Sequence, residues 1–124
     1  MLPVRVMISE NCKDYAGLLS QRLSMYPDIQ IVGIAGDGDK TIKMLPLLQP
    51  DVLLLDIVMP EVDGLEVLRR MRGVHSSTAV YVISALGSDD IIRQALALGA
   101  RYYFVKPFNT SSMVMRIREV NTFH

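Results

Sequence analysis

Several features that would place this chain outside the cytosol or in a membrane are missing from its sequence. Its single cysteine, Cys12, cannot form a disulfide within the chain, which fits a reducing compartment. No apolar run approaches the roughly 20 residues that a membrane span requires. Residues 1–5 also lack the charged and apolar regions of a secretory signal. We therefore expect a cytoplasmic protein without a membrane partner.

An excess of charge of either sign is also missing, because 13 basic residues balance 13 acidic residues. Binding to nucleic acid requires phosphate neutralisation by a basic excess or patch, so we do not expect this chain to bind DNA by itself. The sequence shows no low-complexity tract, linker or internal repeat. Its 124 residues, 50% of them hydrophobic, give room for one domain with one core.

What the sequence does contain is a regular alternation of two kinds of segment. Short apolar, β-rich segments predict strands at 5–8, 29–35, 52–55, 79–83 and 102–105. Apolar residues near helical spacing predict helices at 14–26, 41–48, 65–72, 88–98 and from 109 onward. Pro46 lies inside the second of these helices, where we expect a kink or an early end. Strict alternation with short loops predicts an α/β fold, a doubly wound five-stranded parallel sheet with helices on both faces.

The segment from Pro50 to Gly64 is the centre of this pattern. Its unbroken apolar run, residues 52–55, suits a central parallel strand that is covered on both faces. The run ends at Asp56, at the edge where open α/β sheets bind their ligands. Asp63 and Gly64 then supply turn chemistry before the next helix. An aspartate in this place can also simply cap the following turn, and only the rest of the chain distinguishes the two interpretations.

Polar residues directly follow four of the predicted strands; they are Glu10, Asn11, Asp56, Ser84 and Lys106. The carboxyl ends of parallel strands meet at one edge of the sheet, so we expect these side chains to lie together. Carboxylate oxygens suit Mg²⁺, and an ammonium and a hydroxyl suit the oxygens of an anion, so the set predicts phosphoryl chemistry. Each residue alone has an ordinary alternative, such as a helix cap at Asn11, but the whole set is hard to explain by chance.

Three segments resemble the receiver domains of two-component response regulators. They read L-L-L-D-I-V-M-P-E-V-D-G over 53–64, S-A over 84–85 and Y-F-V-K-P-F over 103–108. The resemblance covers essentially the whole chain and implies one receiver domain over 1–124, with the flavodoxin-like (βα)5 receiver fold. Within the family, the segments over 50–60 and 98–108 are most similar to those of the regulators of bacterial sporulation. That likeness implies a transcriptional output, through a DNA-binding effector domain that is C-terminal to this chain and absent from it.

The resemblance implies a phosphorylation-activated switch of a two-component system or phosphorelay. Asp56 would accept a phosphoryl group from the phosphohistidine of a histidine kinase or histidine phosphotransferase protein. The backbone carbonyl of Val58 would bind the metal beside Asp56, Ser84 would bind a phosphoryl oxygen, and Lys106 would pair with the phosphate. Tyr103 matches the switch aromatic, which turns inward as Ser84 moves toward the phosphate. The only catalysis implied is this self-catalysed transfer to Asp56.

The residues after the first predicted strand depart from the family pattern of two acids. Glu10 fills the first place, but Asn11 replaces the second acid, a direct metal ligand, so we expect weakened binding of Mg²⁺ or another divalent cation. The resemblance also places Val58 and Leu86 beside the phosphoryl group, where a polar side chain could hold the hydrolytic water. Both are apolar, so we expect slow dephosphorylation. The family also implies a phosphorylation-dependent homodimer through a charged surface on the fourth helix, fifth strand and fifth helix.

Three alternative functions can be compared through the residues that each of them depends on. A phosphohydrolase with an aspartyl-phosphate intermediate would need a second acid two residues after Asp56, where Val58 stands. A flavin-binding module would need a glycine- and hydroxyl-rich loop after the first strand, where Glu10 places an acid instead. A degenerate receiver, which docks partners without being phosphorylated, is favoured only by Asn11.

Overall fold

The computed structural model describes residues 2–75 and 77–123, and along them strands and helices alternate. The elements are β1 (Val4–Ser9), α1 (Lys13–Ser24), β2 (Ile29–Ala35), α2 (Gly38–Leu48), β3 (Val52–Asp56), α3 (Gly64–Met71), β4 (Ala79–Ser84), α4 (Asp89–Ala97), β5 (Tyr102–Val105) and α5 (Thr110–Phe123). This order confirms the predicted alternation. No helix among these residues is long and apolar enough to cross a bilayer.

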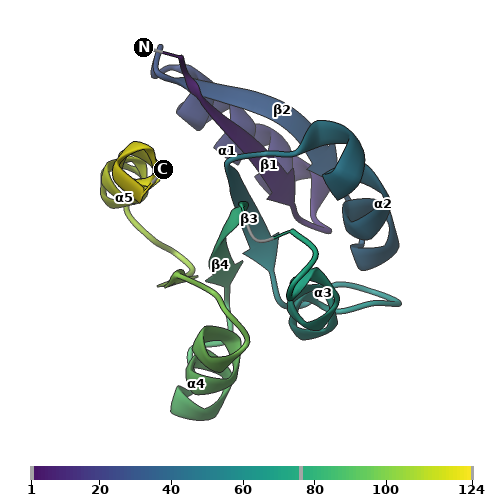
Figure 1. Cartoon of the computed structure of the whole chain (residues 1–124). Coiled ribbons are helices and arrows are strands. Elements are labelled where there is room, and N and C mark those ends of the chain that lie inside the picture. The colour runs from purple at the N-terminus through teal and green to yellow at the C-terminus, as the bar shows by residue number, and fades with distance from the viewer. Residues whose placement is uncertain (1, 76, 124) are drawn as a thin grey trace.

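The five strands form one parallel sheet with the order β2-β1-β3-β4-β5 (Figure 1). β3 lies in the middle, paired with β1 on one side and β4 on the other, and all of its residues are buried. This explains why its sequence is continuously apolar up to Asp56, since a central strand has no solvent-facing side. The chain reverses its direction of growth across the sheet between β2 and β3, which makes the fold doubly wound.

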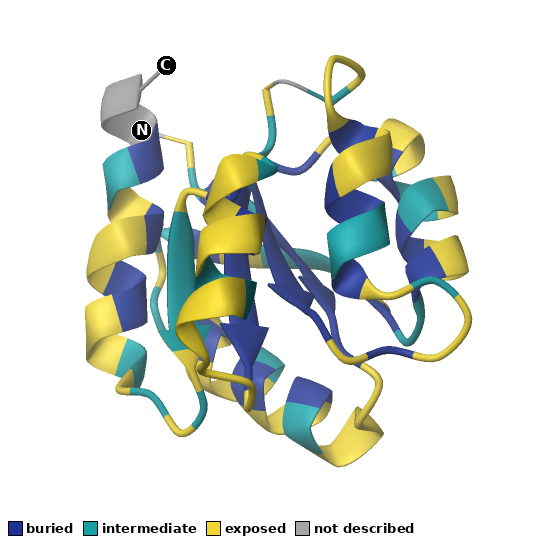
Figure 2. Ribbon diagram, turned by 90° about the horizontal axis from the view of Figure 1, so that it is seen from below, coloured by how far each residue is buried: buried dark blue, intermediate teal, exposed yellow. Residues whose placement is uncertain are grey.

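Two hydrophobic cores cover the two faces of the sheet. Val52 and Leu54 point to the core formed with α1 and α5, and Leu53 and Leu55 point to the core formed with α2, α3 and α4. In Figure 2 the central strands are dark blue, the outer strands β2 and β5 carry intermediate and exposed residues, and the helices carry both buried and exposed residues. Complete burial of one leucine contributes about 1.5–3 kcal/mol, so β3 anchors both cores.

The first residue of α2 differs from the prediction, whereas its last residue agrees with it. The helix begins at Gly38 rather than at 41, because Asp37 caps it by accepting a hydrogen bond from the Lys40 N–H at 2.8 Å. It continues past Pro46 to Leu48, the last residue of the predicted helix, so it does not end early at the proline. Pro46 is exposed and costs the helix one backbone hydrogen bond, while the buried Leu45 holds the last turn against the sheet.

Candidate functional site

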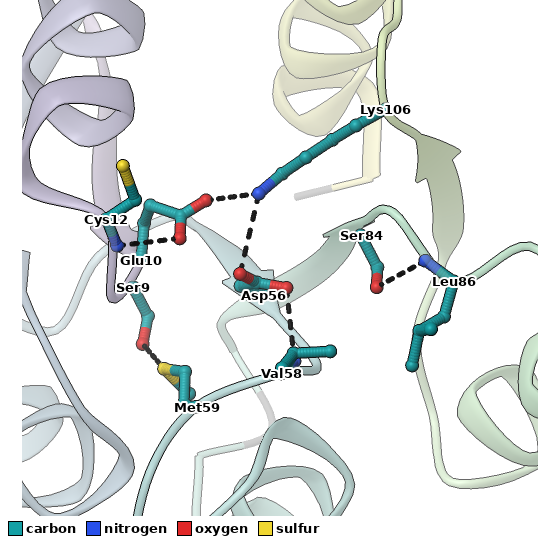
Figure 3. Close-up of polar contacts among 9 residues, drawn as sticks. All are labelled: Ser9, Glu10, Cys12, Asp56, Val58, Met59, Ser84, Leu86 and Lys106. Atoms are coloured by element: carbon teal, nitrogen blue, oxygen red, sulfur yellow. Dashed lines mark hydrogen bonds and ion pairs between the residues drawn. The ribbon is translucent and has the colours of Figure 1, made fainter.

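The carboxyl ends of β1, β3, β4 and β5 bring the predicted polar residues to one edge of the sheet. Glu10 follows β1, Asp56 and Ser84 end β3 and β4, and Lys106 follows β5. Figure 3 shows Lys106 extending across this edge toward Glu10 and Asp56, which come from different strands. The structure therefore brings together four of the five residues that follow the strands, and Asn11 lies beside them on the exposed start of the loop to α1.

Lys106 joins the two buried carboxylates. Its Nζ lies 2.5 Å from Oε1 of Glu10 and 3.5 Å from Oδ2 of Asp56. The side chains of Glu10 and Asp56 are only 2% and 7% exposed, so these ion pairs are poorly screened by water. The second oxygen of Glu10 accepts a hydrogen bond from the Cys12 N–H at 3.1 Å. The peptide bond between Lys106 and Pro107 is cis.

The surroundings of the Asp56 carboxyl group disfavour its ionised form. Burial raises its pKa most, and the hydrogen-bonded side chain and negative charge of Glu10 raise it further. The positive charge of Lys106 and a hydrogen bond from the Val58 N–H oppose the rise, and the pKa of Asp56 is about 6. Two close carboxylates with one ammonium leave a negative excess, which a divalent cation would neutralise.

The loop between β3 and α3 holds Asp56 in place. The Val58 N–H donates to Oδ1 of Asp56 at 3.1 Å, and the Gly64 N–H donates to the Ile57 carbonyl at 2.9 Å. A Cβ at Gly64 would lie 2.4 Å from the Asp56 carbonyl oxygen, so only glycine permits this close approach. Asp63 caps α3 by accepting from the Glu66 N–H at 3.0 Å. Asp63 and Gly64 therefore stabilise the loop that follows Asp56.

Ser84 and Tyr103 meet at the loop between β4 and α4. The buried Ser84 Oγ accepts a hydrogen bond from the Leu86 N–H at 3.1 Å, and the Tyr103 hydroxyl donates to the Leu86 carbonyl. Burial raises the pKa of Tyr103, the Ser84 side chain lowers it, and the negative charge of Asp56 raises it. The aromatic ring expected to act as a switch therefore contacts the same loop as Ser84.

The side chains nearest to a cation site supply oxygen atoms. Glu10 and Asp56 offer carboxylates, and Val58 and Asn11 lie on the two loops that flank them. Among the described residues there is no group of three or more His, Cys, Asp or Glu side chains that could hold a metal. This donor set fits Mg²⁺, which accepts few protein oxygens and retains water ligands.

Some residues were misjudged from the sequence or missed. Cys12 is exposed at the start of α1, and its side chain does not cap the helix. The ring of Tyr15 lies against Lys106, with Nζ at 4.3 Å from the ring centroid. Buried Ser9 and Thr41 share a hydrogen bond beside the site. The apolar spacing of α1 indicated that Tyr15 faces inward, but nothing local in the sequence paired it with Lys106.

The comparisons with known proteins agree with this geometry. A model of the response regulator receiver domain matches residues 6–118. The chain belongs to the response regulator receiver family. This receiver is 28% identical to the signal receiver domain of the response regulator NarL from Mycobacterium tuberculosis, with a TM-score of 0.92 and 100% of each chain covered.

Two further solved structures show the same likeness. The response regulator domain of CheB from Thermotoga maritima is 27% identical, with a TM-score of 0.88 over 96% of this receiver and 97% of that chain. The CheX–CheY–BeF₃–Mg²⁺ complex from Borrelia burgdorferi matches at 27% identity and a TM-score of 0.84, over 97% of this receiver and 90% of that chain. These likenesses confirm the receiver fold, while the roles of individual residues stay predictions.

Proposed function

We propose that this receiver is a phosphorylation-activated switch whose phosphoacceptor is Asp56. The observation that carries the proposal is the position of the Asp56 carboxylate, buried at the end of the central strand with the Lys106 ammonium 3.5 Å from it. This arrangement presents one nucleophilic oxygen next to a fixed positive charge, as phosphoryl transfer requires. The donor would be the phosphohistidine of a histidine kinase or a histidine phosphotransferase.

In the proposed reaction, an oxygen of Asp56 attacks the phosphorus atom of the donor. The new O–P bond forms as the N–P bond of phosphohistidine breaks, and the electron pair returns to the imidazole nitrogen. Lys106 offsets negative charge on the phosphoryl oxygens, and Ser84 donates its hydroxyl to one of them. A Mg²⁺ ion held by Glu10, Asp56, the Val58 carbonyl and Asn11 would supply further neutralisation.

The experiment that tests this proposal is intact-mass measurement after incubation with acetyl phosphate and Mg²⁺. Wild-type protein should gain the mass of one phosphoryl group, and Asp56→Asn should gain none because the amide is not a nucleophile. Asp14→Asn is the matched control, since Asp14 is an exposed aspartate on α1. Absence of the adduct on wild type, or its persistence on Asp56→Asn, contradicts the proposal. The first result would favour a degenerate receiver that docks partners without phosphorylation.

Replacement of Asn11 by Asp should tighten Mg²⁺ binding roughly tenfold, because hard cations bind more strongly as the negative charge of their ligands rises. Calorimetric titration of both proteins measures the effect. Gln21→Glu, which adds the same charge at an exposed position farther along α1, should leave the affinity unchanged. Equal or weaker binding to Asn11→Asp would show that Asn11 lies outside the metal shell.

We expect this receiver to be monomeric without phosphate and to form a weak dimer with it, through α4, β5 and α5. The charges on that surface are partly paired within the chain, Arg116 with Glu119 at 2.7 Å and Arg93 with Asp89 at 4.0 Å. Ion pairs exchanged between exposed surfaces are screened by salt, so the dimer should dissociate as salt is raised. Light scattering at several salt concentrations measures this, and a stable dimer without phosphate would contradict it.

The proposed output of the switch is transcription control in sporulation. It is supported only by the motifs over 50–60 and 98–108, which are most similar to those of sporulation regulators. DNA would then be bound by a separate effector domain rather than by this receiver, whose charges balance. Substitution of Asp56 by Ala in the source organism, followed by spore counts, tests the output independently of the phosphorylation assay.

A further inference from the structure

The Lys106 ammonium has three neighbours that hold it over the site. Two are the carboxylates of Glu10 and Asp56, and the third is the face of the Tyr15 ring, whose centroid is 4.3 Å from Nζ. Tyr15 belongs to the first turn of α1, so this contact joins α1 to the loop that follows β5. We propose that Tyr15 is a positioning residue for phosphoryl transfer, whose ring keeps the Lys106 ammonium beside Asp56; this rests on the proposed function.

The contact of Lys106 with the Tyr15 ring differs from its two ion pairs, because phosphorylation does not alter the ring. A cation would compete with Lys106 for the oxygens of Glu10, and the phosphoryl group would occupy an oxygen of Asp56. Both ion pairs of Lys106 must therefore rearrange during the reaction, whereas an aromatic face attracts the ammonium throughout. A lysine side chain is flexible and strongly hydrated, so without this face it would more often extend into water. The side chain of Lys106 is only 20% exposed in this arrangement.

Packing fixes the ring in its place. Tyr15 is half-buried against the core that α1 and α5 share, and it lines a small cavity with Leu19 and Phe108. Phe108 lies two residues after Lys106, so one aromatic side chain of the β5–α5 loop contacts the same cavity as the ring. Within the described part of the chain, the Tyr15 hydroxyl makes no hydrogen bond. The contribution should therefore come from the ring and not from the hydroxyl.

The test compares Tyr15→Leu, which removes the aromatic face, with Tyr15→Phe, which retains it. Tyr15→Leu should lower the rate constant for phosphorylation by acetyl phosphate at saturating Mg²⁺ about fivefold. Tyr15→Phe should stay within twofold of wild type, about the precision of the assay. Tyr26→Leu is the matched control: the ring of Tyr26 carries Arg118 at 5.5 Å instead of Lys106, and its loss should leave the rate unchanged.

Two further measurements separate positioning from a general effect on structure. In a Lys106→Met background, followed at high donor concentration, Tyr15→Leu should cause no further loss of rate. Nuclear magnetic resonance should show the Lys106 side-chain protons shifted upfield by the ring in wild type and in Tyr15→Phe, and unshifted in Tyr15→Leu. This second readout needs no phosphorylation, so it tests the contact even if wild type accepts no phosphate and the proposed function fails.

Three results would overturn the role of Tyr15. One is an unchanged rate in Tyr15→Leu, which would make the contact irrelevant to transfer. Another is an equal loss in Tyr15→Phe, which would assign the effect to the hydroxyl. The third is evidence that Tyr15 does not act through the lysine, given either by the same loss in the Lys106→Met background or by an unshifted Lys106 in wild type.

Discussion

Asp56→Asn should stabilise the unphosphorylated, metal-free protein near neutral pH by about 2 kcal/mol. Most substitutions of a buried residue destabilise a fold, so the sign of this effect is diagnostic. The cause is that burial and the negative charge of Glu10 disfavour the ionised form of Asp56, whose side chain is only 7% exposed. An asparagine carries no charge, its oxygen can still accept from the Val58 N–H, and Lys106 remains paired with Glu10 at 2.5 Å.

The pH dependence of the free energy of unfolding tests the origin of this stabilisation. The pKa of Asp56 rises from 3.8 to about 6 on folding, so protonation favours the folded state. The stability that this group contributes is fully present below the unfolded value of 3.8 and is lost as pH rises through about 6. The advantage of Asp56→Asn should therefore be absent at low pH, grow over that interval and level off above it.

Urea unfolding at a series of pH values, in the presence of a chelator, measures the difference. Asp14→Asn, at an exposed position in the first turn of α1, should change stability little at any pH. Mg²⁺ should reduce the advantage of Asp56→Asn, because a cation stabilises the folded wild type by binding its carboxylates. A variant that is less stable than wild type near neutral pH, or an advantage that persists at low pH, would contradict this account of the site.

The positions of the site residues relative to the strands decide which of them could be predicted from the sequence. Asp56, Ser84 and Lys106 were predictable because each directly ends or follows an apolar strand, and parallel strands end at one edge. The raised pKa of Asp56 comes first from its own burial and then from the nearby Glu10, and both depend on tertiary packing around the edge that the sequence does not show. Tyr15 was missed for that reason, since its contact with Lys106 joins residues that are far apart in the chain.

The sequence predicted the fold more completely than it predicted the first and last residues of each helix and strand. The buried strand at 52–56 and the alternation around it left one arrangement, a parallel sheet covered by helices. The error at α2 arose because Gly36, Asp37 and Gly38 have the composition of a turn. There the Asp37 side chain satisfies the Lys40 N–H and starts a helix, and a Cβ at Gly38 would lie 2.0 Å from the Val62 carbonyl oxygen. Local composition cannot show that tertiary approach.

Polar residues introduced at Val58 and Leu86 should shorten the lifetime of the phosphorylated receiver by roughly tenfold. Hydrolysis of an aspartyl phosphate needs a water aligned opposite the leaving carboxylate, and a polar side chain beside the phosphoryl group can hold it. Val58 and Leu86 are 55% and 39% exposed at the site, apolar, and unable to orient water. We therefore expect slow self-dephosphorylation in wild type, which suits a lasting commitment better than a rapid response.

The lifetime is measured by intact mass after removal of the donor, for wild type and for a double variant, Val58→Asn with Leu86→Glu. Neither side chain belongs to the buried core, since Val58 is 55% and Leu86 39% exposed, so their replacement should leave the fold and the loading step intact. Val74→Asn is the control, because Val74 is 69% exposed and lies after α3, away from the strand ends that form the site. Decay of wild type within seconds would show that water is already aligned without these side chains. An unchanged lifetime in the double variant would show that neither position reaches the attacking water, and slow decay would then have to arise from the charge missing at Asn11.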